Sequence, residues 1–295
     1  MKSRWLLNLA LLLVVAGIVL FLYLRPTEPV EQQADKNYPV SDVAPSAISK
    51  ISIEFPAKAP LVLERRDGNW LLAQPYRARA GKNVVYHVLS ILSASSPQKF
   101  AADNLSRFGL DAPVLRLRLD AEEISFGTYN PVSGLQYIAY RNAVYMVSNR
   151  YSEVAGTQVV EFLDKNPLAP SETIAGFDFS RLEQWEPTGL RVDLQNGKWQ
   201  VSIPAAKPQQ QELNEWFAEV WGNATATSVE PYQPDRNTTY PSFEVKLPDG
   251  KRVHFDKLQE SPELLLARPD EGLIYHYPMD QGFAMLNPPV GFKPQ

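Results

Sequence analysis

Apolar and polar residues alternate strictly in two distant segments of the chain. In "PVLRLRLD" (113–120) the leucines share one face and the arginines the other. "PSFEVKLP" (241–248) repeats the pattern with Phe243, Val245 and Leu247 on one face. A period of two predicts β-strands with one buried and one wet face, as in antiparallel sheets.

Two glycine-containing turns lead into the same short pattern. The segments "DGNWLLAQP" (67–75) and "NGKWQVSIP" (196–204) each place Gly two residues before Trp and Pro five residues after it. Asp-Gly and Asn-Gly between apolar runs predict β-hairpin turns. Trp70 and Trp199, 129 residues apart, are therefore predicted to pack on the inner faces of two sheets.

The offset of 129 residues continues into a predicted helix after each hairpin. Apolar residues recur at i, i+4, i+7 and i+8, which is one stripe of an amphipathic helix. The stripe consists of Val84, Val88, Ile91 and Leu92 in the first copy and of Leu213, Phe217, Val220 and Trp221 in the second. The pattern thus predicts a tandem duplication of one sheet-and-helix unit.

A continuous apolar run, "WLLNLALLLVVAGIVLFLYL" (5–24), precedes both units. Its 20 residues contain one polar side chain and no charge, and a helix of this length spans a bilayer core of about 30 Å. Lys2 and Arg4 precede the run, so the N-terminus is expected in the cytoplasm. A cleaved signal peptide is the competing interpretation, but bulky residues occupy the natural cleavage position.

We therefore expect an α+β protein in which an N-terminal transmembrane helix is followed by two tandem repeats. Each repeat is expected to be an antiparallel sheet with one packed helix. The expected boundaries are 1–25 for the anchor, 26–45 for a polar linker, 46–168 for the first repeat and 169–295 for the second.

Composition narrows the chemistry of the chain. Its 295 residues are 44% hydrophobic, which is sufficient for a sizeable core. There is no Cys, so disulfides, thiol catalysis and cysteine metal sites are excluded. The net charge of −4 is a poor match to phosphate backbones, and nucleic acid is not an expected partner.

The three histidines are the first candidates for a metal or acid–base site. His87 lies on the first predicted helix, off its apolar stripe. His254 and His276 fall in predicted strands of the second repeat, where they could meet across a sheet and touch a metal together with Asp256. Zinc requires three or four ligands in tight geometry, and the chain has no HxxxH or HExxH spacing. We predict no catalytic, cofactor-binding or metal-binding residue.

Acidic and basic clusters offer two further candidates. A glycosidase would need a pair of carboxylates, but the acids concerned fall mostly at predicted turns, where solvated acids are common. These acids are Glu122, Glu123, Asp249, Asp256, Asp270 and Glu271. The basic cluster follows the first hairpin and is interpreted as a solvated edge that prevents sheet aggregation, with a contact to anionic lipid or polymer as the alternative. It consists of Arg65, Arg66, Arg77 and Arg79.

The segment "RFGLDAP" (107–113) reads as a tight loop before an alternating strand. Together with "DGNWLLAQP" and the helix that follows, it resembles a bacterial family described as a domain of unknown function. That family occurs in envelope proteins and in auxiliary components of gliding-motility-type ABC transporters. The resemblance is clear over roughly 48–165 and weaker over 172–285. It implies a membrane-tethered extracytoplasmic module and supplies no catalytic residues.

These observations favour a non-enzymatic periplasmic scaffold or accessory subunit of a bacterial envelope complex, with a transporter as one candidate complex. The expected protein crosses the inner membrane once through residues 5–24, and its expected partner is another envelope protein. The alternative is a module that binds lipid, glycan or a peptidoglycan fragment in a groove between the repeats. A hydrolase with an unrecognised site is the least favoured interpretation.

Overall fold

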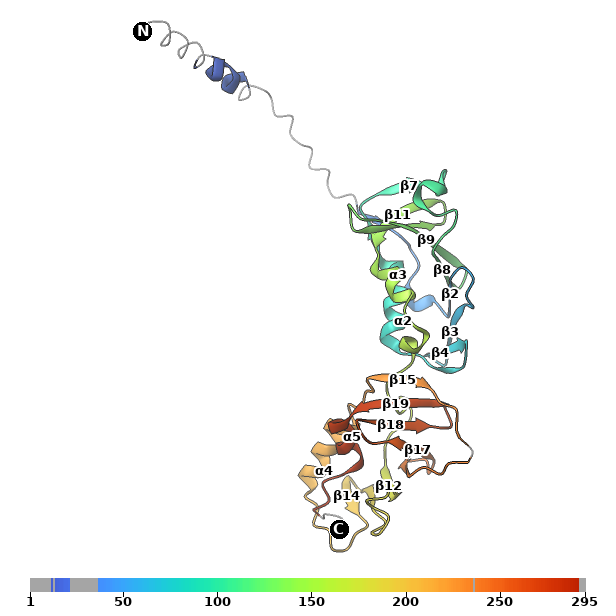
Figure 1. The fold of residues 1–295 in the computed structure, drawn as a ribbon, viewed down its shortest axis with the longest axis vertical. Coiled ribbons are helices and arrows are strands. Elements are labelled where there is room, and N and C mark those ends of the chain that lie inside the picture. Colours follow the sequence, from blue (N-terminus) through green and yellow to red (C-terminus); the bar gives the residue numbers. More distant parts are fainter. Residues whose placement is uncertain (1–11, 13, 22–36, 236, 292–295) are drawn as a thin grey trace.

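The computed structural model describes residues 12, 14–21, 37–235 and 237–291. Two large antiparallel sheets dominate this part of the chain, and a few short helices accompany them. The mixed α+β class predicted from the sequence is therefore confirmed. Figure 1 shows the two sheets following one another along the long axis, with the labelled helices on the same side of both.

The first sheet has the strand order β5-β4-β3-β2-β8-β9-β10-β11-β7. Helix α2 (Lys82–Leu89) leads into a 3₁₀ turn (Ser90–Ser93), and α3 (Arg150–Ala155) follows the last strand. The strands are β2 (Lys50–Glu54), β3 (Leu61–Arg66), β4 (Asn69–Gln74), β5 (Ala78–Arg79), β7 (Lys99–Ala101), β8 (Leu115–Leu119), β9 (Glu122–Asn130), β10 (Leu135–Tyr140) and β11 (Ala143–Ser148).

The second sheet has the strand order β14-β13-β12-β16-β17-β18-β19-β15. Helix α4 (Gln210–Trp216) continues into a π-helical turn (Phe217–Trp221), and α5 (Met279–Leu286) follows the last strand. The strands are β12 (Gly176–Arg181), β13 (Arg191–Gln195), β14 (Lys198–Val201), β15 (Ser228–Pro231), β16 (Ser242–Lys246), β17 (Arg252–Gln259), β18 (Glu263–Arg268) and β19 (Leu273–Pro278).

The two sheets are built in the same order. When β12–β14 are matched to β2–β4, and β15–β19 to β7–β11, the strand sequences coincide, apart from the additional edge strand β5. The hairpin pairing also repeats at the offset seen in the sequence, because Arg65 lies opposite Trp70 as Leu194 lies opposite Trp199. This agreement is what a duplicated unit requires.

Pairing at the centre of the two sheets differs by two residues. Ile51 lies opposite Leu119 across β2 and β8, whereas Phe177 lies opposite Val245 across β12 and β16. In the aligned sequences Phe177 corresponds to Ile51, but Val245 corresponds to Leu117. A shift of two residues leaves every side chain on its own face, so both registers bury the same apolar stripe.

The predicted membrane anchor is covered only in part. Within 5–24, residues 12 and 14–21 are described and helical, and the remainder lies outside the described residues. No helix in the described ranges combines the length and the apolar character that crossing a membrane requires. The anchor therefore stays a prediction.

Each unit binds the chain segment that precedes it. Tyr38–Pro39 (β1) pairs with Ser95–Ser96 (β6), and the amide of Val40 donates to the carbonyl of Ala94 at 2.9 Å. In the second unit the amide of Ala226 donates to the carbonyl of Lys165 at 2.8 Å. The end of the predicted linker 26–45 thus belongs to the folded first unit, and residues 26–36 lie outside the described residues.

The duplicated tryptophans are not equally buried. Trp199 is 2% exposed, and the centre of its ring lies 5.0 Å from that of Phe217. Trp70 is only half-buried at the margin of the first core, which corrects the prediction that both pack fully inside. The residue that covers Trp199 is large, whereas the first unit has the smaller Val88 at the position of Phe217.

Three other indole groups close the C-terminal helix of the second unit. Trp185, Trp216 and Trp221 donate from Nε1 to the carbonyls of residues 286, 284 and 285, at 2.9, 2.7 and 3.2 Å. The last carbonyls of a helix have no partner within the helix, so these bonds satisfy buried acceptors. They also fix α4 and its π-helical turn against α5.

The "RFGLDAP" loop packs on the first sheet opposite the main core. Phe108 and Leu110 form a small second cluster there with Val144. A Cβ on Gly127 would lie 2.3 Å from the carbonyl oxygen of Phe108. A Cβ on Gly109, where φ is +66°, would lie 2.5 Å from Thr128. The close contact of loop and strand therefore requires both glycines.

We expect Trp199→Ala to lower the free energy of unfolding by about 3–5 kcal/mol, the usual range for a buried aromatic side chain truncated to Ala. Trp70→Ala is the matched control and should cost about 1–2 kcal/mol, because less apolar surface leaves contact with water there on folding. Urea unfolding of the detergent-solubilised chain measures both values. Equal losses would contradict the difference in burial.

Candidate functional site

The three histidines are far from one another in the fold. His87 is exposed on α2, and β18 separates the strands that carry His254 and His276. Within the described ranges, no group of three or more His, Asp and Glu side chains is arranged to hold a metal ion. The pair considered from the sequence, His254 with His276, is therefore not assembled.

Each of the strand histidines contacts carboxylates instead. His254 Nε2 lies 2.9 Å from Oδ1 of Asp256 on the same strand. His276 lies between two glutamates of neighbouring strands, with Nδ1 3.2 Å from Glu263 and Nε2 3.3 Å from Glu230. Only the contact to Glu263 is a hydrogen bond, and Nε2 is buried without one. Strand pairing places a carboxylate, Glu244, opposite His254, and thus gives this imidazole no hydroxyl to activate.

Most acids considered for a glycosidase pair are bound to basic side chains. The pairs on exposed turns and strands are Glu122–Arg141, Glu123–Arg118 and Asp249–Lys251. Asp270 and Glu271 lie at the junction of the two units, in contact with arginines. Neutralised acids of this kind stabilise loops and do not form the facing acid and base that glycoside hydrolysis needs.

The predicted basic cluster is divided among separate contacts. Arg65 donates to the carbonyl of Ser46 at 3.0 Å, and Arg66 pairs with Glu64 at 2.8 Å. Arg77 is exposed, but the side chain of Arg79 is only 15% exposed, between the two units. The prediction of a solvated edge that includes all four arginines was therefore wrong for Arg79.

Arg79 joins three parts of the chain. Its guanidinium pairs with Glu271 of the second unit at 2.8 Å and with Asp164 of the connector, residues 156–175 between α3 and β12, at 2.5 Å. It also donates to the carbonyl of Asn166 at 2.6 Å and to the hydroxyl of Tyr275 at 2.9 Å. One side chain from β5 is thus bound to the connector and to the second sheet.

Arg268 forms an equivalent centre on the second unit. Its side chain is 3% exposed and donates to both carboxylate oxygens of Glu172, at 2.8 and 2.7 Å. Further bonds reach Asp270 at 2.9 Å and the carbonyl of Pro167 at 2.8 Å. Glu271 lies 3.4 Å from Arg268 and so links the two arginines. We call this set the junction network: Arg79, Asp164, Glu172, Arg268, Asp270, Glu271 and Tyr275.

Burial and charge act in opposite directions within the junction network. Burial disfavours the ionised form of Glu172, but hydrogen bonds from Arg268 and from the amide of Ala169 outweigh it and lower the pKa of Glu172. Burial raises the pKa of Tyr275, so its hydroxyl stays protonated and donates to Glu271 at 2.8 Å. At neutral pH the network therefore combines ionised carboxylates with a neutral phenol.

A groove of about 540 Å³ opens beside the junction network. Asp164 belongs to its lining and to the network. The other walls come from the start of α2 (Gly81–Val84), from connector residues such as Lys165 and Asn166, and from Thr225 of the second unit. Polar side chains from both units therefore face this space, as the alternative function requires.

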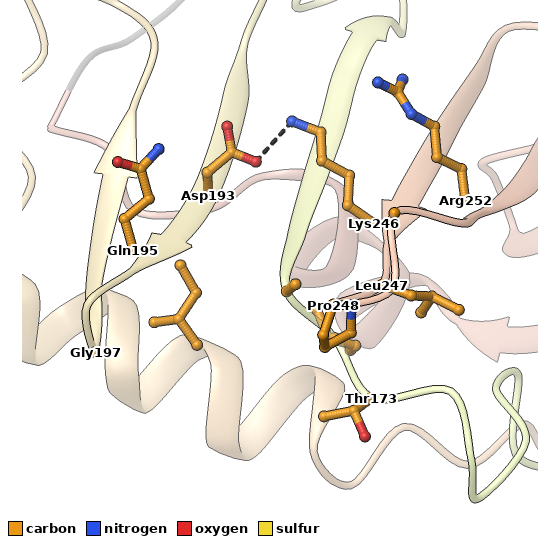
Figure 2. A pocket seen from close by; sticks show the side chains of 12 residues that line it. Thr173, Asp193, Gln195, Gly197, Lys246, Leu247, Pro248 and Arg252 are labelled. Atoms are coloured by element: carbon orange, nitrogen blue, oxygen red, sulfur yellow. Dashed lines mark hydrogen bonds and ion pairs between the residues drawn. The ribbon is translucent and has the colours of Figure 1, made fainter.

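A second hollow, of about 780 Å³, lies on the polar face of the second sheet (Figure 2). Lys246 Nζ pairs with Asp193 at 2.6 Å across Gly176, whose neighbours on the two sides are these residues. A Cβ on Gly176 would lie 2.6 Å from Asp193 Oδ1, so glycine leaves room for the ion pair. Arg252 is paired with Glu244 at 2.6 Å, and the charged lining of this hollow is thus neutralised internally.

The junction network was not predicted from the sequence. Arg79 stands among other arginines, and Asp270 and Glu271 stand in a turn, so each has a plain local interpretation. One signal was present, because Leu264, Leu266 and Arg268 alternate on the buried face of β18. A charged residue at an inward position indicates a buried partner of opposite charge.

We expect the stability of the chain to fall as the pH drops below about 4.3, the ordinary pKa of Glu. Because the folded-state pKa of Glu172 is lowered, its contribution is present above the unfolded pKa and is lost as the pH falls through the folded value. Glu172→Gln should be less stable at neutral pH and should lose less on acidification. Thermal unfolding over a pH series measures this, and parallel curves for the two proteins would refute it.

The chain matches one family model over residues 70–231, more than half of its length. The match begins at Trp70 in β4 and ends at Pro231 in β15, so it crosses the junction of the two units. Searches of curated proteins and of solved structures give no match. The chain therefore belongs to the family described as domain of unknown function DUF4340.

Proposed function

We propose that this protein is a non-enzymatic scaffold or accessory subunit of a bacterial envelope complex. The observation that carries the proposal is the junction network, in which Arg79 of the first unit binds Glu271 and Tyr275 of the second. Charge-assisted hydrogen bonds in a largely buried setting hold groups in one geometry. A fixed coupling of two units suits a spacer that presents a partner-binding surface better than it suits a hinge that closes around a substrate.

The arrangement of the chain supports the same proposal. Figure 1 shows β1 entering the first unit, with the second unit further along the long axis. With residues 5–24 as a single-pass anchor in the inner membrane, the second unit would project into the periplasm. The family's occurrence in auxiliary components of ABC transporters makes a transporter one candidate for the complex.

The groove beside the junction network favours a second candidate function. Its lining combines Lys82 and Asn83 of the first unit with Thr225 of the second. A site of this kind would bind a lipid headgroup, a glycan or a peptidoglycan fragment through hydrogen bonds from both units. In that case the fixed junction would serve to keep the two walls of the groove in register.

We expect function to depend on attachment to the membrane. In a deletion strain, a variant with residues 1–25 replaced by a cleavable signal peptide should restore the phenotype poorly, because a released scaffold loses its local concentration at the complex. The same replacement with an unrelated single-pass anchor is the control and should restore it. Full restoration by the released form would contradict a tethered scaffold.

Point variants distinguish the candidate functions in the same strain. A scaffold predicts that His254→Ala, His276→Ala and Asp256→Asn each restore the phenotype, whereas loss of a general acid or base commonly lowers a rate by about 10²–10⁴-fold. Thr225→Trp fills the groove and should also be tolerated. A folded but inactive Thr225→Trp variant would favour ligand binding at the junction. An inactive variant at any of the other three positions would indicate an acid–base site.

A further inference from the structure

The helices of the second unit expose an apolar pair. Met279 and Phe283 lie one turn apart on α5 and are 55% and 59% exposed. The opposite side of this helix is packed tightly, since Gly282 is buried and a Cβ there would lie 2.3 Å from Leu264. Residues at i and i+4 share one face of a helix, so the two large side chains form a single apolar spot.

A row of carboxylates lies on the neighbouring helix. Glu212, Glu215 and Glu219 are spaced at i, i+3 and i+7 along α4 and its π-helical turn, and all three are exposed. Figure 1 shows α4 and α5 side by side on the same flank of the second unit. The indole bonds from Trp216 and Trp221 to the end of α5 hold this placement. We call Glu212, Glu215, Glu219, Met279 and Phe283 the helical surface.

The charge of the helical surface is not balanced locally. Residues 208–234 contain four acids and no Lys or Arg, and residues 278–291 add Asp280 and no base. Within the described residues none of the three glutamates forms an ion pair, and Glu215 accepts one hydrogen bond, from the amide of Gln211 at 2.8 Å. An exposed apolar spot next to unpaired carboxylates fits a partner that is apolar on one side and cationic around it.

The first unit does not carry the same chemistry. The duplication preserves the buried stripe of the helix, but it does not preserve the outer positions. At the offset of 129 residues, the counterparts of the three glutamates are Asn83, Tyr86 and Ser90. Packing does not account for this difference, because exposed positions are free of the constraints of the core.

We propose that the helical surface binds a cationic amphipathic helix of a partner protein. The apolar stripe of that helix would cover Met279 and Phe283, and its Lys and Arg side chains would pair with Glu212, Glu215 and Glu219. This proposal rests on the partner-binding role proposed above and specifies the partner's chemistry. An anionic membrane surface is disfavoured, because it would repel the same carboxylates.

Binding of a model peptide to the full chain in detergent tests the proposal. The probe is a fluorescently labelled synthetic helix with Leu on one face and Lys on the others, and a scrambled peptide of the same composition is the control. Fluorescence anisotropy should show binding of the amphipathic peptide that is at least about tenfold tighter than that of the scrambled peptide. Phe283→Ser and the double variant Glu215→Lys with Glu219→Lys should each weaken it about tenfold or more.

Tyr86→Ser, at the equivalent helix of the first unit, is the matched control variant and should bind the peptide like the wild type. Circular dichroism verifies that each variant is folded. Equal binding of both peptides, or unchanged binding to the Phe283 and glutamate variants, would overturn the proposal. So would preferential binding of the chain to vesicles of anionic lipid through these residues. Such results would leave the complementation outcomes for the scaffold unaffected, since those depend on attachment and not on this peptide.

Discussion

The placement of the second unit against the first depends on the guanidinium of Arg79. Burying a charge is costly unless its partners satisfy it, and a planar guanidinium has five donors in fixed directions. Glu271, Asp164 and Tyr275, with the carbonyl of Asn166, supply acceptors from the second unit and the connector. A displaced second unit would leave this cation buried and incompletely bound. The network thus selects one relative orientation, whatever its net contribution to the free energy of folding.

The fold was largely predictable because its determinants are local. Asp-Gly and Asn-Gly turns, strict alternation in β8 and β16, and the repeated helical stripe each act over a few residues, and the offset between copies exposes the duplication. The two-residue shift between central strands was not predictable, because both registers bury the same faces. The half-burial of Trp70 depends on the size of a residue in another element, Val88, which the periodicity does not specify.

The candidate site was less predictable, because its residues are distant in the chain. Arg79 and Glu271 are separated by 192 residues, and each has an ordinary local interpretation as a surface charge. Only Arg268 departs from the local pattern, at an inward position of β18. Duplication also conceals divergence, because the common core requires only apolar volume. One copy adds the "RFGLDAP" loop and the other adds three indole donors to the end of α5.

The pairing of each unit with its preceding segment bears on how the molecule is assembled during synthesis. The first unit contains its own lead-in strand, β1, and is closed by the backbone bond from Gly81 to Phe162, so it can fold once the chain has passed that point. Domains emerging from the ribosome generally fold as units, N-terminal first. Arg79 must then remain hydrated until Glu271 and Tyr275 have been made and their sheet has formed. Docking of the two units is therefore the last step, and it is the step at which the arginine is dehydrated.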